Sequence, residues 1–422
     1  MSHAHPIELL PERIADRLAD PDAVPRQLTD RPWWRQSLAH GAPGIALLHI
    51  ERAAAGLAPW QPAHAWLAHA THAPLTAGAD SHLFYGAPAL GHALACAAAH
   101  RPDRYGRALD TLDQAIAKDT HRRLDDAHAR MDRCHLPALA EFDVIRGLAG
   151  LGRYLLHHDP KSQAIRHVLE YLVRLTNPVA VGGEILPGWW TMSSPTGRPS
   201  DDFLHGHANN GMAHGIAGPL ALLALAARQG VTVTGQRTAI TTILAWLDRW
   251  RVTTSTGPAW PYWITRPHLR AGQRDVPDTQ RPSWCYGTAG LARAQQLAGV
   301  ALADATRCER AERALLGAMS SPAQRSGMSD ASLCHGYAGL AHLATVVAAD
   351  ASPTLAERLR AIVPGLLDAV ALGQHDAVTS AATLASSDPG LLEGASGTAL
   401  AILGATTWTP SRTGWDTCLL IA

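Results

Sequence analysis

Two short motifs contain residue types that could bind a metal ion and activate a thiol. Cys285 lies in Ser-Trp-Cys-Tyr-Gly-Thr-Ala-Gly, and Cys334 and His335 lie in Leu-Cys-His-Gly-Tyr-Ala-Gly. Two thiolates and one imidazole supply three zinc ligands and leave the fourth tetrahedral position open, as in catalytic zinc sites. The cysteines are about fifty residues apart, which excludes a zinc-finger loop. Only the fold can bring them together. The structural alternative is two buried cysteines and a capping histidine.

Both motifs belong to a Gly-x-x-Gly step that recurs along the chain. Six clear copies and one degraded copy, in which Ala89 replaces the second glycine, begin at Gly41, Gly86, Gly147, Gly215, Gly287, Gly336 and Gly394. The intervals of about 45 to 72 residues suit a repeated helix pair with a loop. Each step precedes a small-residue, apolar helix, whereas intervening segments such as 162–175 and 237–250 are amphipathic.

The repeat predicts an all-α fold. Apolar helices belong inside and amphipathic ones outside, so we expect a double α,α-toroid with seven inner and seven outer helices, forming a single domain over residues 1–422. Glycine at each step would avoid a Cβ collision where helices converge, or would permit positive φ. Residues 177–211 and 253–282 are rich in Gly, Pro and Trp. They are expected to be loop or hairpin excursions that flank the site, or else a simple aromatic lid.

Such a ring would place the residues that precede the steps in one cluster. If all inner helices start at the same end, their N-termini favour negative charge there. The residues immediately before the steps are His40, Tyr85, Arg146, His214, Tyr286, His335 and Glu393. Polar residues at every such position are unexpected for core packing alone.

Composition excludes several classes of protein. The 36 basic and 36 acidic residues balance, so a nucleic-acid partner is not indicated. No apolar run is long enough for a transmembrane segment, and residues 1–18 lack the apolar core of a signal peptide. Six dispersed cysteines do not form a secreted disulfide framework. A cytoplasmic protein with free thiols is therefore expected.

The motifs resemble those of the lanthipeptide synthetase C family, the lanthionine cyclases. The matching segments are Trp-Cys-Tyr-Gly at 284–287, Cys-His-Gly at 334–336, Ala-His-Gly-Ile-Ala-Gly at 213–218, Asp-Val-Ile-Arg-Gly at 143–147 and Trp-Asp-Thr-Cys-Leu-Leu at 415–420. The resemblance extends over essentially the full chain, and Ala89 is the departure from the repeat. It implies an α,α-toroid with one zinc ion per chain that adds peptide cysteine thiols to dehydroalanine or dehydrobutyrine, closing thioether rings.

Thioether formation assigns expected roles to a small set of residues. We expect Cys285, Cys334 and His335 to be the zinc ligands, because zinc keeps a coordinated thiol deprotonated. Addition to the double bond creates an enolate that must be protonated at the α-carbon.

Four further residues are expected to serve this protonation step. His214 is the candidate acid and Asp143 its orienting partner, while Arg281 and Tyr286 could stabilise the enolate oxygen. Helix capping by His214 or Asp143 and structural roles for Arg281 and Tyr286 stay open as alternatives. The sequence does not decide which group moves the proton.

Other cysteines and histidines are expected to lie outside the chemistry. Cys134 and His135 imitate the ligand pair but precede Leu-Pro instead of a glycine step, so Cys134 is interpreted as a packing or surface thiol. His205 and His207 lie in the loop before the His214 step and could line a groove.

Three other functions compete with the cyclase. A zinc thiol alkyltransferase of the prenyltransferase type would need an aromatic-lined cavity, and the chain has only three Phe. A non-catalytic scaffold that binds glutathione is the second. An α,α-ring glycosidase using Glu393 and Asp143 as its carboxylates would leave the cysteines without a role.

The resemblance also implies partners. These are a dehydrated precursor peptide as substrate, a lanthipeptide dehydratase and a transporter complex. The protein would then be cytoplasmic and would reach the membrane through these partner proteins only.

Overall fold

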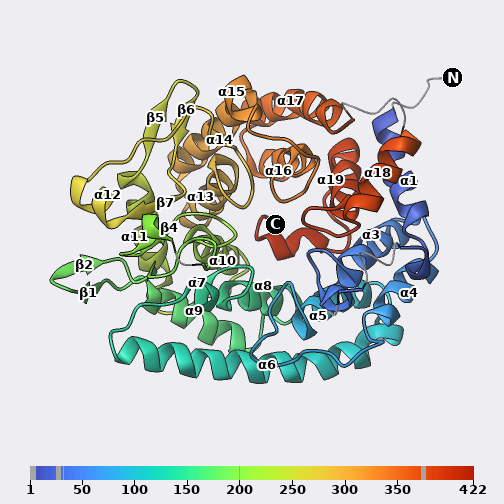
Figure 1. The fold of residues 1–422 in the computed structure, drawn as a ribbon, viewed down its shortest axis with the longest axis horizontal. Coiled ribbons are helices and arrows are strands. Elements are labelled where there is room, and N and C mark those ends of the chain that lie inside the picture. Colours follow the sequence, from blue (N-terminus) through green and yellow to red (C-terminus); the bar gives the residue numbers. More distant parts are fainter. Residues whose placement is uncertain (1–5, 25–29, 32, 199, 372–376) are drawn as a thin grey trace. The chain divides into compact units, whose positions relative to one another are not determined.

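The computed structural model describes residues 6–24, 30–31, 33–198, 200–371 and 377–422. Most of these residues lie in helices, and short strands lie between α9 and α12 in the sequence (Figure 1). The chain divides into two compact units, Met1–Ile116 with Met328–Asp416, and Ala117–Gly327 with Thr417–Ala422. The long helix α6, Pro102–Asp132, contains the boundary between the two units.

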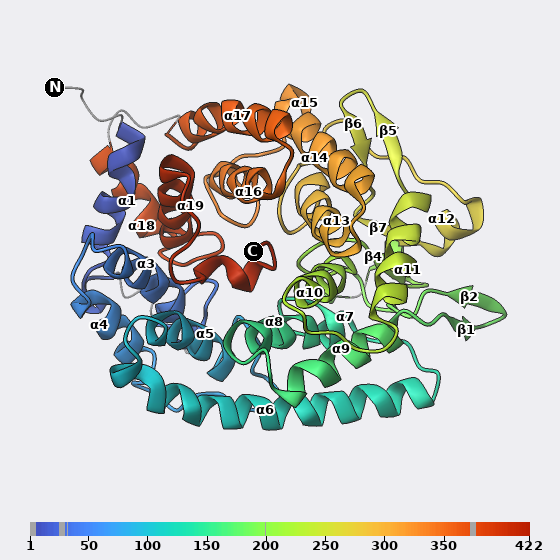
Figure 2. The same cartoon turned by 180° about the vertical axis from the view of Figure 1, so that it is seen from behind.

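The first unit is helical throughout its described part. Helix α19 packs against both α16 and α3, and α3 also packs against α4 and α5 (Figures 1 and 2). The helices of this unit are α1 (Pro6–Arg17), α3 (Ala42–Ala54), α4 (Gln61–His69), α5 (Ala87–Ala98), α16 (Tyr337–Asp350), α17 (Pro353–Ala371), α18 (Ala377–Ser387) and α19 (Ala395–Thr407), with 3₁₀ turns η1 (Pro21–Ala23) and η2 (Trp34–Gln36).

The second unit combines helices with three small antiparallel sheets. Its helices are α7 (Leu139–Phe142), α8 (Leu148–His158), α9 (Gln163–Leu175), α10 (Ala217–Arg228), α11 (Gln236–Arg249), α12 (Arg266–Ala271), α13 (Thr288–Leu302), α14 (Ala305–Ser320) and α15 (Pro322–Arg325), with 3₁₀ turn η3 (Asp201–Phe203). A further 3₁₀ turn, η4 (Trp415–Leu419), contains the boundary between the units near the C-terminus.

The strands lie in the two segments expected to be less helical. Strands β1 (Val179–Val181) and β2 (Glu184–Leu186) form one hairpin, and β5 (Val252–Thr254) and β6 (Gly257–Ala259) form another. The central strand β4 (His207–Asn209) pairs with β3 (Trp190–Thr191) and β7 (Trp263–Thr265). The short helix α12 was not expected within residues 253–282. That these segments flank the site stays a prediction.

Seven helices begin at the seven glycine steps, and we call these the step helices. They are α3, α5, α8, α10, α13, α16 and α19, and each is buried over most of its length. The helices between them are amphipathic. In α9, for example, Ile165, Val168, Leu169 and Leu172 are buried, while the Ser162 hydroxyl caps the N-terminus. The prediction of a mostly helical, step-organised chain is confirmed.

The step glycines serve a local purpose in addition to the expected ones. In five step helices the second glycine lies in the first turn, where a Cβ would come within 1.7 to 2.8 Å of the carbonyl oxygen six residues earlier. Gly397, for example, would bring a Cβ to 1.7 Å from the Leu391 oxygen. Among the glycines that begin the seven steps, only Gly86 and Gly287 have a positive φ. The steps therefore permit close packing of each helix on its own preceding loop. They also permit contact with the neighbouring repeat, since a Cβ at Gly218 would come within 2.4 Å of the Val144 side chain and one at Gly44 within 2.9 Å of Leu391.

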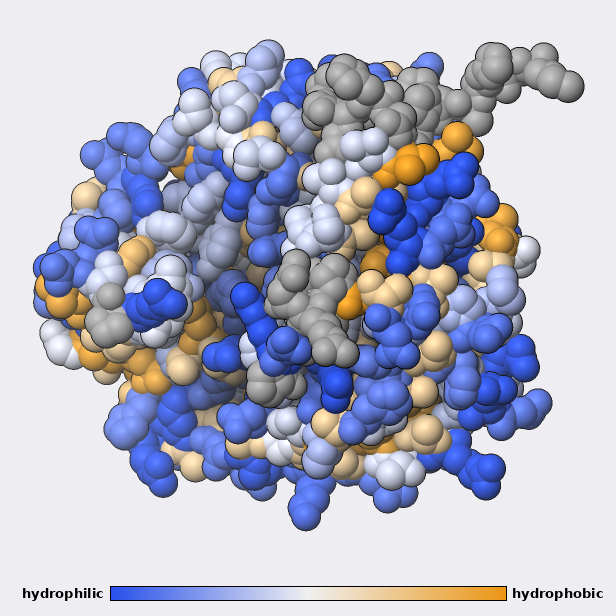
Figure 3. All heavy atoms as spheres, turned by 45° about the vertical axis from the view of Figure 1, so that its right-hand side comes forward, coloured by the Kyte–Doolittle hydropathy of each residue, from blue (hydrophilic) through white to orange (hydrophobic). Residues whose placement is uncertain are grey.

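The visible surface is mainly polar. On the face shown in Figure 3, hydrophilic residues predominate and hydrophobic ones form small, separate patches. Among the residues described, none of the helices combines the length and apolar character that a membrane crossing needs.

Candidate active site

A histidine–carboxylate pair lies in the second unit, just before two step helices. Asp143 ends α7, and its Oδ1 accepts hydrogen bonds from the backbone N–H groups of Arg146 (2.6 Å) and Gly147 (2.8 Å). Its Oδ2 lies 2.7 Å from Nδ1 of His214. The Asp143 side chain is 2 % exposed and that of His214 is 33 % exposed. The carboxylate therefore holds the turn before α8 and also bonds the imidazole, whereas the helix N-cap alternative is wrong, because Gly147 is the N-cap of α8.

This pairing determines which nitrogen of His214 can serve chemistry. An ionised carboxylate only accepts hydrogen bonds, so Nδ1 of His214 carries the hydrogen that points to Asp143. The other ring nitrogen, Nε2, is then the one that can exchange a proton with another molecule. Partial exposure gives it access to solvent or to a ligand.

Tyr286 lies next to His214, held by a residue that the sequence analysis did not single out. The two rings are 6.2 Å apart, and the Tyr286 hydroxyl accepts a hydrogen bond from Nδ2 of Asn209 at 2.9 Å. Asn209 is fully buried on β4, and its Oδ1 accepts the backbone N–H of Gly211. Both ends of the Asn209 amide are thus bonded, which fixes the position of the phenol oxygen.

Asn209 occupies a position that recurs in the repeat. Asn209, Asp330 and Asp388 each stand six residues before a step glycine. In each case the side-chain oxygen accepts the backbone N–H two residues later, at 2.9, 2.8 and 2.7 Å respectively. An Asn or Asp at this fixed offset is the sequence signal that could have identified all three.

Arg281 is positioned mainly through its backbone. Its carbonyl oxygen accepts a hydrogen bond from the Tyr262 hydroxyl at 3.1 Å, and a Cβ at Gly287, where φ is 122°, would come within 2.2 Å of the same oxygen. The Tyr262 ring lies 5.5 Å from that of Tyr286. Burial raises the pKa of Tyr262 to about 12, so this phenol stays protonated. Tyr262 is a second residue of the site that the sequence analysis did not identify.

Cys285 is buried in the second unit and directly precedes Tyr286 in the sequence. Its Sγ lies 3.7 Å from Oγ of Ser283, and its carbonyl oxygen accepts the Ala213 N–H. The preceding Trp284 is fixed by a hydrogen bond from its indole to the Leu419 carbonyl. Cys285, Tyr286, Arg281, His214 and Asp143 therefore all belong to the second unit.

The other two expected ligands, Cys334 and His335, belong to the first unit. The Cys334 thiol is buried, and its Sγ lies within 4.8 Å of a ring nitrogen of His335. Nε2 of His335 lies 3.2 Å from Oδ2 of Asp330. Burial raises the pKa of Asp330, but hydrogen bonds from His335 and Ser332 outweigh it and hold the pKa well below its ordinary value.

This arrangement fits the chemistry of a metal ligand. Metal-binding histidines generally hydrogen-bond a carboxylate through the nitrogen that does not bind the metal, as His335 does with Asp330. The buried, adjacent Cys334 thiol is the kind of soft ligand that zinc prefers. Cys334 and His335 therefore suit a zinc ion.

A second group of possible ligands lies in the first unit. Nδ1 of His40 lies 2.7 Å from Oδ2 of Asp388, and ligand atoms of His40, Asp388 and Glu393 all lie within 4.8 Å of one another, as a metal site would require. His40 and Glu393 both precede glycine steps. Within each unit, therefore, two residues that precede steps lie together: His40 with Glu393, and His214 with Tyr286.

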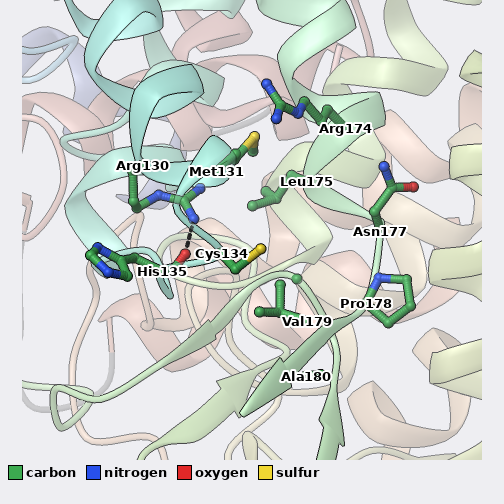
Figure 4. A pocket seen from close by; sticks show the side chains of 11 residues that line it. Arg130, Met131, Cys134, His135, Arg174, Leu175, Asn177, Pro178, Val179 and Ala180 are labelled. Atoms are coloured by element: carbon green, nitrogen blue, oxygen red, sulfur yellow. Dashed lines mark hydrogen bonds between the residues drawn. The ribbon is translucent and has the colours of Figure 1, made fainter.

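The imitation pair Cys134 and His135 does not form a ligand pair. The thiol and the imidazole point in opposite directions, and Cys134 lines a surface pocket of about 230 Å³ together with Met131 and Leu175 (Figure 4). The His135 carbonyl accepts a hydrogen bond from Arg130. Cys134 is exposed, which agrees with a surface thiol.

The two histidines of the loop before the His214 step are placed differently from each other. His205 is exposed, whereas His207 is fully buried on β4. Burial lowers the pKa of His207 to about 4. His207 is therefore a neutral packing residue and does not line a groove.

Comparisons with known proteins agree with the repeat. The profile of the family described as "Lanthionine synthetase C-like protein" matches residues 32–420. The nisin biosynthesis protein NisC of Lactococcus lactis subsp. lactis is 24 % identical over 251 residues, which are 58 % of this chain and 57 % of NisC. The alignment thus spans little more than half of that relative's length.

A solved structure extends the agreement to the fold. The structure of a nisin cyclase matches with a TM-score of 0.74 at 20 % identity, covering 98 % of this chain and 96 % of that one. At this identity the likeness shows the fold, and it confirms the predicted class, all-α and of the LanC-like toroid type. The family profile covers most of the sequence, and the chain belongs to the lanthionine synthetase C-like family.

Proposed function

We propose that this protein is a lanthionine-forming cyclase, which closes thioether rings in a dehydrated precursor peptide. The observation that carries the proposal is the His214–Asp143 pair beside Tyr286, in the same unit as Cys285. A fixed imidazole next to a phenol is suited to the proton transfer that follows thiol addition. Membership of the family supports the reaction class.

One zinc ion per chain is part of the proposal, with Cys285, Cys334 and His335 as its ligands. Two thiolates and an imidazole are a donor set typical of catalytic zinc, with one position left for a substrate thiol. Zinc bound there would keep that thiol deprotonated near neutral pH. Asp330 would fix the orientation of His335 through their hydrogen bond.

The ring-closing step requires one sulfur–carbon bond and one proton. The peptide thiolate attacks the β-carbon of the dehydro residue, and the electrons of the double bond move to the adjacent carbonyl oxygen, giving an enolate. Nε2 of His214 takes up the proton that the thiol releases, directly or through solvent, and then delivers it to the α-carbon. The net reaction adds the sulfur and the hydrogen of the thiol across the double bond, so the product has the same mass as the reactant.

Asp143 makes His214 suitable for this transfer. Its Oδ2 accepts Nδ1–H, which fixes the orientation and tautomer of the ring and leaves Nε2 to take up and deliver a proton. Tyr286, whose hydroxyl is fixed by Asn209, and the Arg281 guanidinium are assigned to stabilising the enolate oxygen. These groups bind, orient and protonate, and they need no conformational rearrangement of the buried carboxylate.

The test combines metal analysis with thiol counting. The purified protein is expected to contain about one zinc ion per chain, and the double variant Cys285→Ala/Cys334→Ala is expected to contain almost none. Because ring closure leaves mass unchanged, alkylation of a dehydrated, cysteine-containing peptide before and after incubation counts the thiols consumed. The variant Cys134→Ala, which removes the exposed imitation cysteine, is the matched control and should retain zinc and activity.

Two outcomes would contradict the proposal in different ways. Full zinc content in the double variant would overturn the ligand assignment. Zinc binding with no loss of peptide thiols would instead indicate a thiol-binding scaffold. We also propose that a lanthipeptide dehydratase supplies the substrate, and that a transporter complex is a further partner of this cytoplasmic protein. Co-purification from cells that contain all three proteins tests this.

A further inference from the structure

A small cavity in the first unit is lined by none of the residues assigned above to the reaction. Its volume is about 200 Å³, and its lining comes from α3, α16, α19 and the segment that follows α19. Leu400, Trp415 and His342 are buried at its floor, whereas Leu57 and Thr407 are exposed at its rim. The cavity therefore opens to solvent and has an apolar, aromatic base.

One buried polar atom at this floor lacks a partner. His342 is 4 % exposed, and its Nε2 lies 2.9 Å from Oδ2 of Asp416. Its ring is stacked on Trp415 with centroids 4.9 Å apart. Nδ1 of His342 is buried without a hydrogen-bond partner among the described residues. A buried imidazole nitrogen left unpaired costs free energy, so it marks a place where a ligand group could bind.

A glycine exposes this nitrogen to the cavity. A Cβ at Gly404 would lie 3.4 Å from Nδ1 and 3.7 Å from Cε1 of His342. Gly404 lines the cavity on α19. The missing side chain at this position therefore leaves open the approach to Nδ1.

The cavity wall is held in place before any ligand arrives. Glu51 accepts hydrogen bonds from the backbone N–H groups of Arg412 and Thr413 and from the hydroxyls of Thr413 and Ser411. The Ser411 hydroxyl in turn accepts the N–H of Trp415 at 3.2 Å. A preformed wall lowers the conformational entropy lost on binding.

The chemistry of His342 indicates the ligand. The Asp416 carboxylate accepts the Nε2 hydrogen, so Nδ1 is the ring nitrogen that is left to accept a hydrogen bond from a ligand. The remaining floor is apolar. We propose that this cavity binds a small, largely apolar molecule that carries one hydroxyl group, which donates its hydrogen to Nδ1 of His342.

Matched probes test the proposal on the full chain. Phenol, titrated while the ¹⁵N signals of labelled histidines are recorded, is expected to shift the His342 imidazole signal in a saturable way. Anisole has the same ring but no hydroxyl hydrogen, and it should bind at least about tenfold more weakly, because Nδ1 is then left unpaired. Equal affinity for phenol and anisole, or preference for benzoate, would overturn the proposal.

Two glycine substitutions separate the cavity from general effects on stability. Gly404→Ala adds one methyl group at ordinary contact distance from His342, so the variant should fold and lose most phenol binding. Gly365→Ala makes the same change in α17, where nothing lies within 4 Å of the added carbon, and should bind phenol as the parent does. Unchanged phenol binding in Gly404→Ala would place the bound phenol outside this cavity and overturn the proposal.

Discussion

The two units each contain a histidine that precedes a glycine step and is paired with an aspartate. In the second unit one such pair is His214 with Asp143. In the first unit the pair that is joined through the same atoms is His40 with Asp388, since His335 bonds Asp330 through Nε2. Both pairs join Nδ1 to Oδ2 at 2.7 Å, and the histidine side chains are 33 % and 36 % exposed. The repeat therefore builds the same hydrogen bond twice.

The surroundings of the two pairs differ. The Asp143 side chain is 2 % exposed and accepts two backbone N–H groups, whereas that of Asp388 is 27 % exposed and accepts one, from Gly390. His214 lies beside Tyr286, while His40 lies beside Trp33 and the carboxylate of Glu393. The hydrogen bond with Asp388 is the main cause that raises the pKa of His40 above its ordinary value. The glycine step supplies the frame, and the neighbouring loops decide what the pair can do.

Removing each histidine tests this comparison with the largest expected effect. His214→Asn should slow ring closure about 10²- to 10⁴-fold, because a positioned general acid contributes this much. His40→Asn should leave the rate within about twofold, since His40 is not assigned to proton transfer. The rate is measured as loss of alkylatable peptide thiols. Zinc content and thermal unfolding serve as controls for both variants. Equal losses in the two would place the first-unit pair in the reaction as well.

The sequence could predict the step helices and the residue types of the site because both depend on local patterns. A Gly-x-x-Gly step marks the start of each step helix. His214 and Tyr286 stand immediately before such glycines, and Asp143 lies four residues before Gly147. The predicted reason for the glycines was incomplete, since Gly397 and its equivalents pack against the carbonyl of their own preceding loop. That contact depends on the conformation of the loop, which no helical periodicity encodes.

The supporting residues could not be found from chemistry-bearing motifs. Asn209 bonds the distant Tyr286, whereas Asp330 bonds the nearby His335 and a turn of its own loop, and an isolated Asn or Asp in a loop is common. The signal that the sequence does contain is their common offset of six residues before a step glycine. His207 shows the reverse case, because its loop position suggested a groove and its place on β4 made it a core residue.

Replacing the aspartate of each His–Asp pair by asparagine tests the role of the carboxylate alone. Asp143→Asn keeps an oxygen for the backbone N–H groups of Arg146 and Gly147, but an amide nitrogen facing His214 cannot accept Nδ1–H. The wrong tautomer of His214 would then be favoured, and we expect about 10²-fold slower ring closure.

Asp388→Asn is the matched variant in the first unit and should change the rate by less than about twofold. The rate of loss of alkylatable peptide thiols is measured for both variants, with their zinc content as the control. An Asp143→Asn variant with normal rate would show that Asp143 only caps its turn.

A smaller effect is expected when Asn209 is made like its equivalents in the first unit. Asn209→Asp preserves the oxygen that accepts the Gly211 N–H, but it removes the Nδ2 donor to the Tyr286 hydroxyl. We expect kcat to fall about tenfold with little change in KM, because the enolate is stabilised after the peptide has bound. Steady-state kinetics on a dehydrated peptide give the split. A rise in KM alone would show that Tyr286 only contacts the substrate.

Acid should weaken the second unit through His207 without altering the rate at neutral pH. Burial lowers the pKa of His207 to about 4 from 6.5, so the unfolded chain binds a proton that the folded chain excludes as pH falls below 6.5. The free energy of unfolding is therefore complete above pH 6.5 and decreases by up to about 3 kcal/mol as pH falls towards 4. In His207→Leu the free energy of unfolding should fall less between pH 6.5 and pH 4 than in the parent. Denaturant unfolding at pH 7.5, 6 and 5 measures this. His205→Leu, at the exposed histidine two residues earlier, should leave the slope as in the parent. If both variants keep the parental dependence of the free energy of unfolding on pH, another buried group is responsible for the acid sensitivity. In that case β4 holds Asn209 independently of the charge on His207.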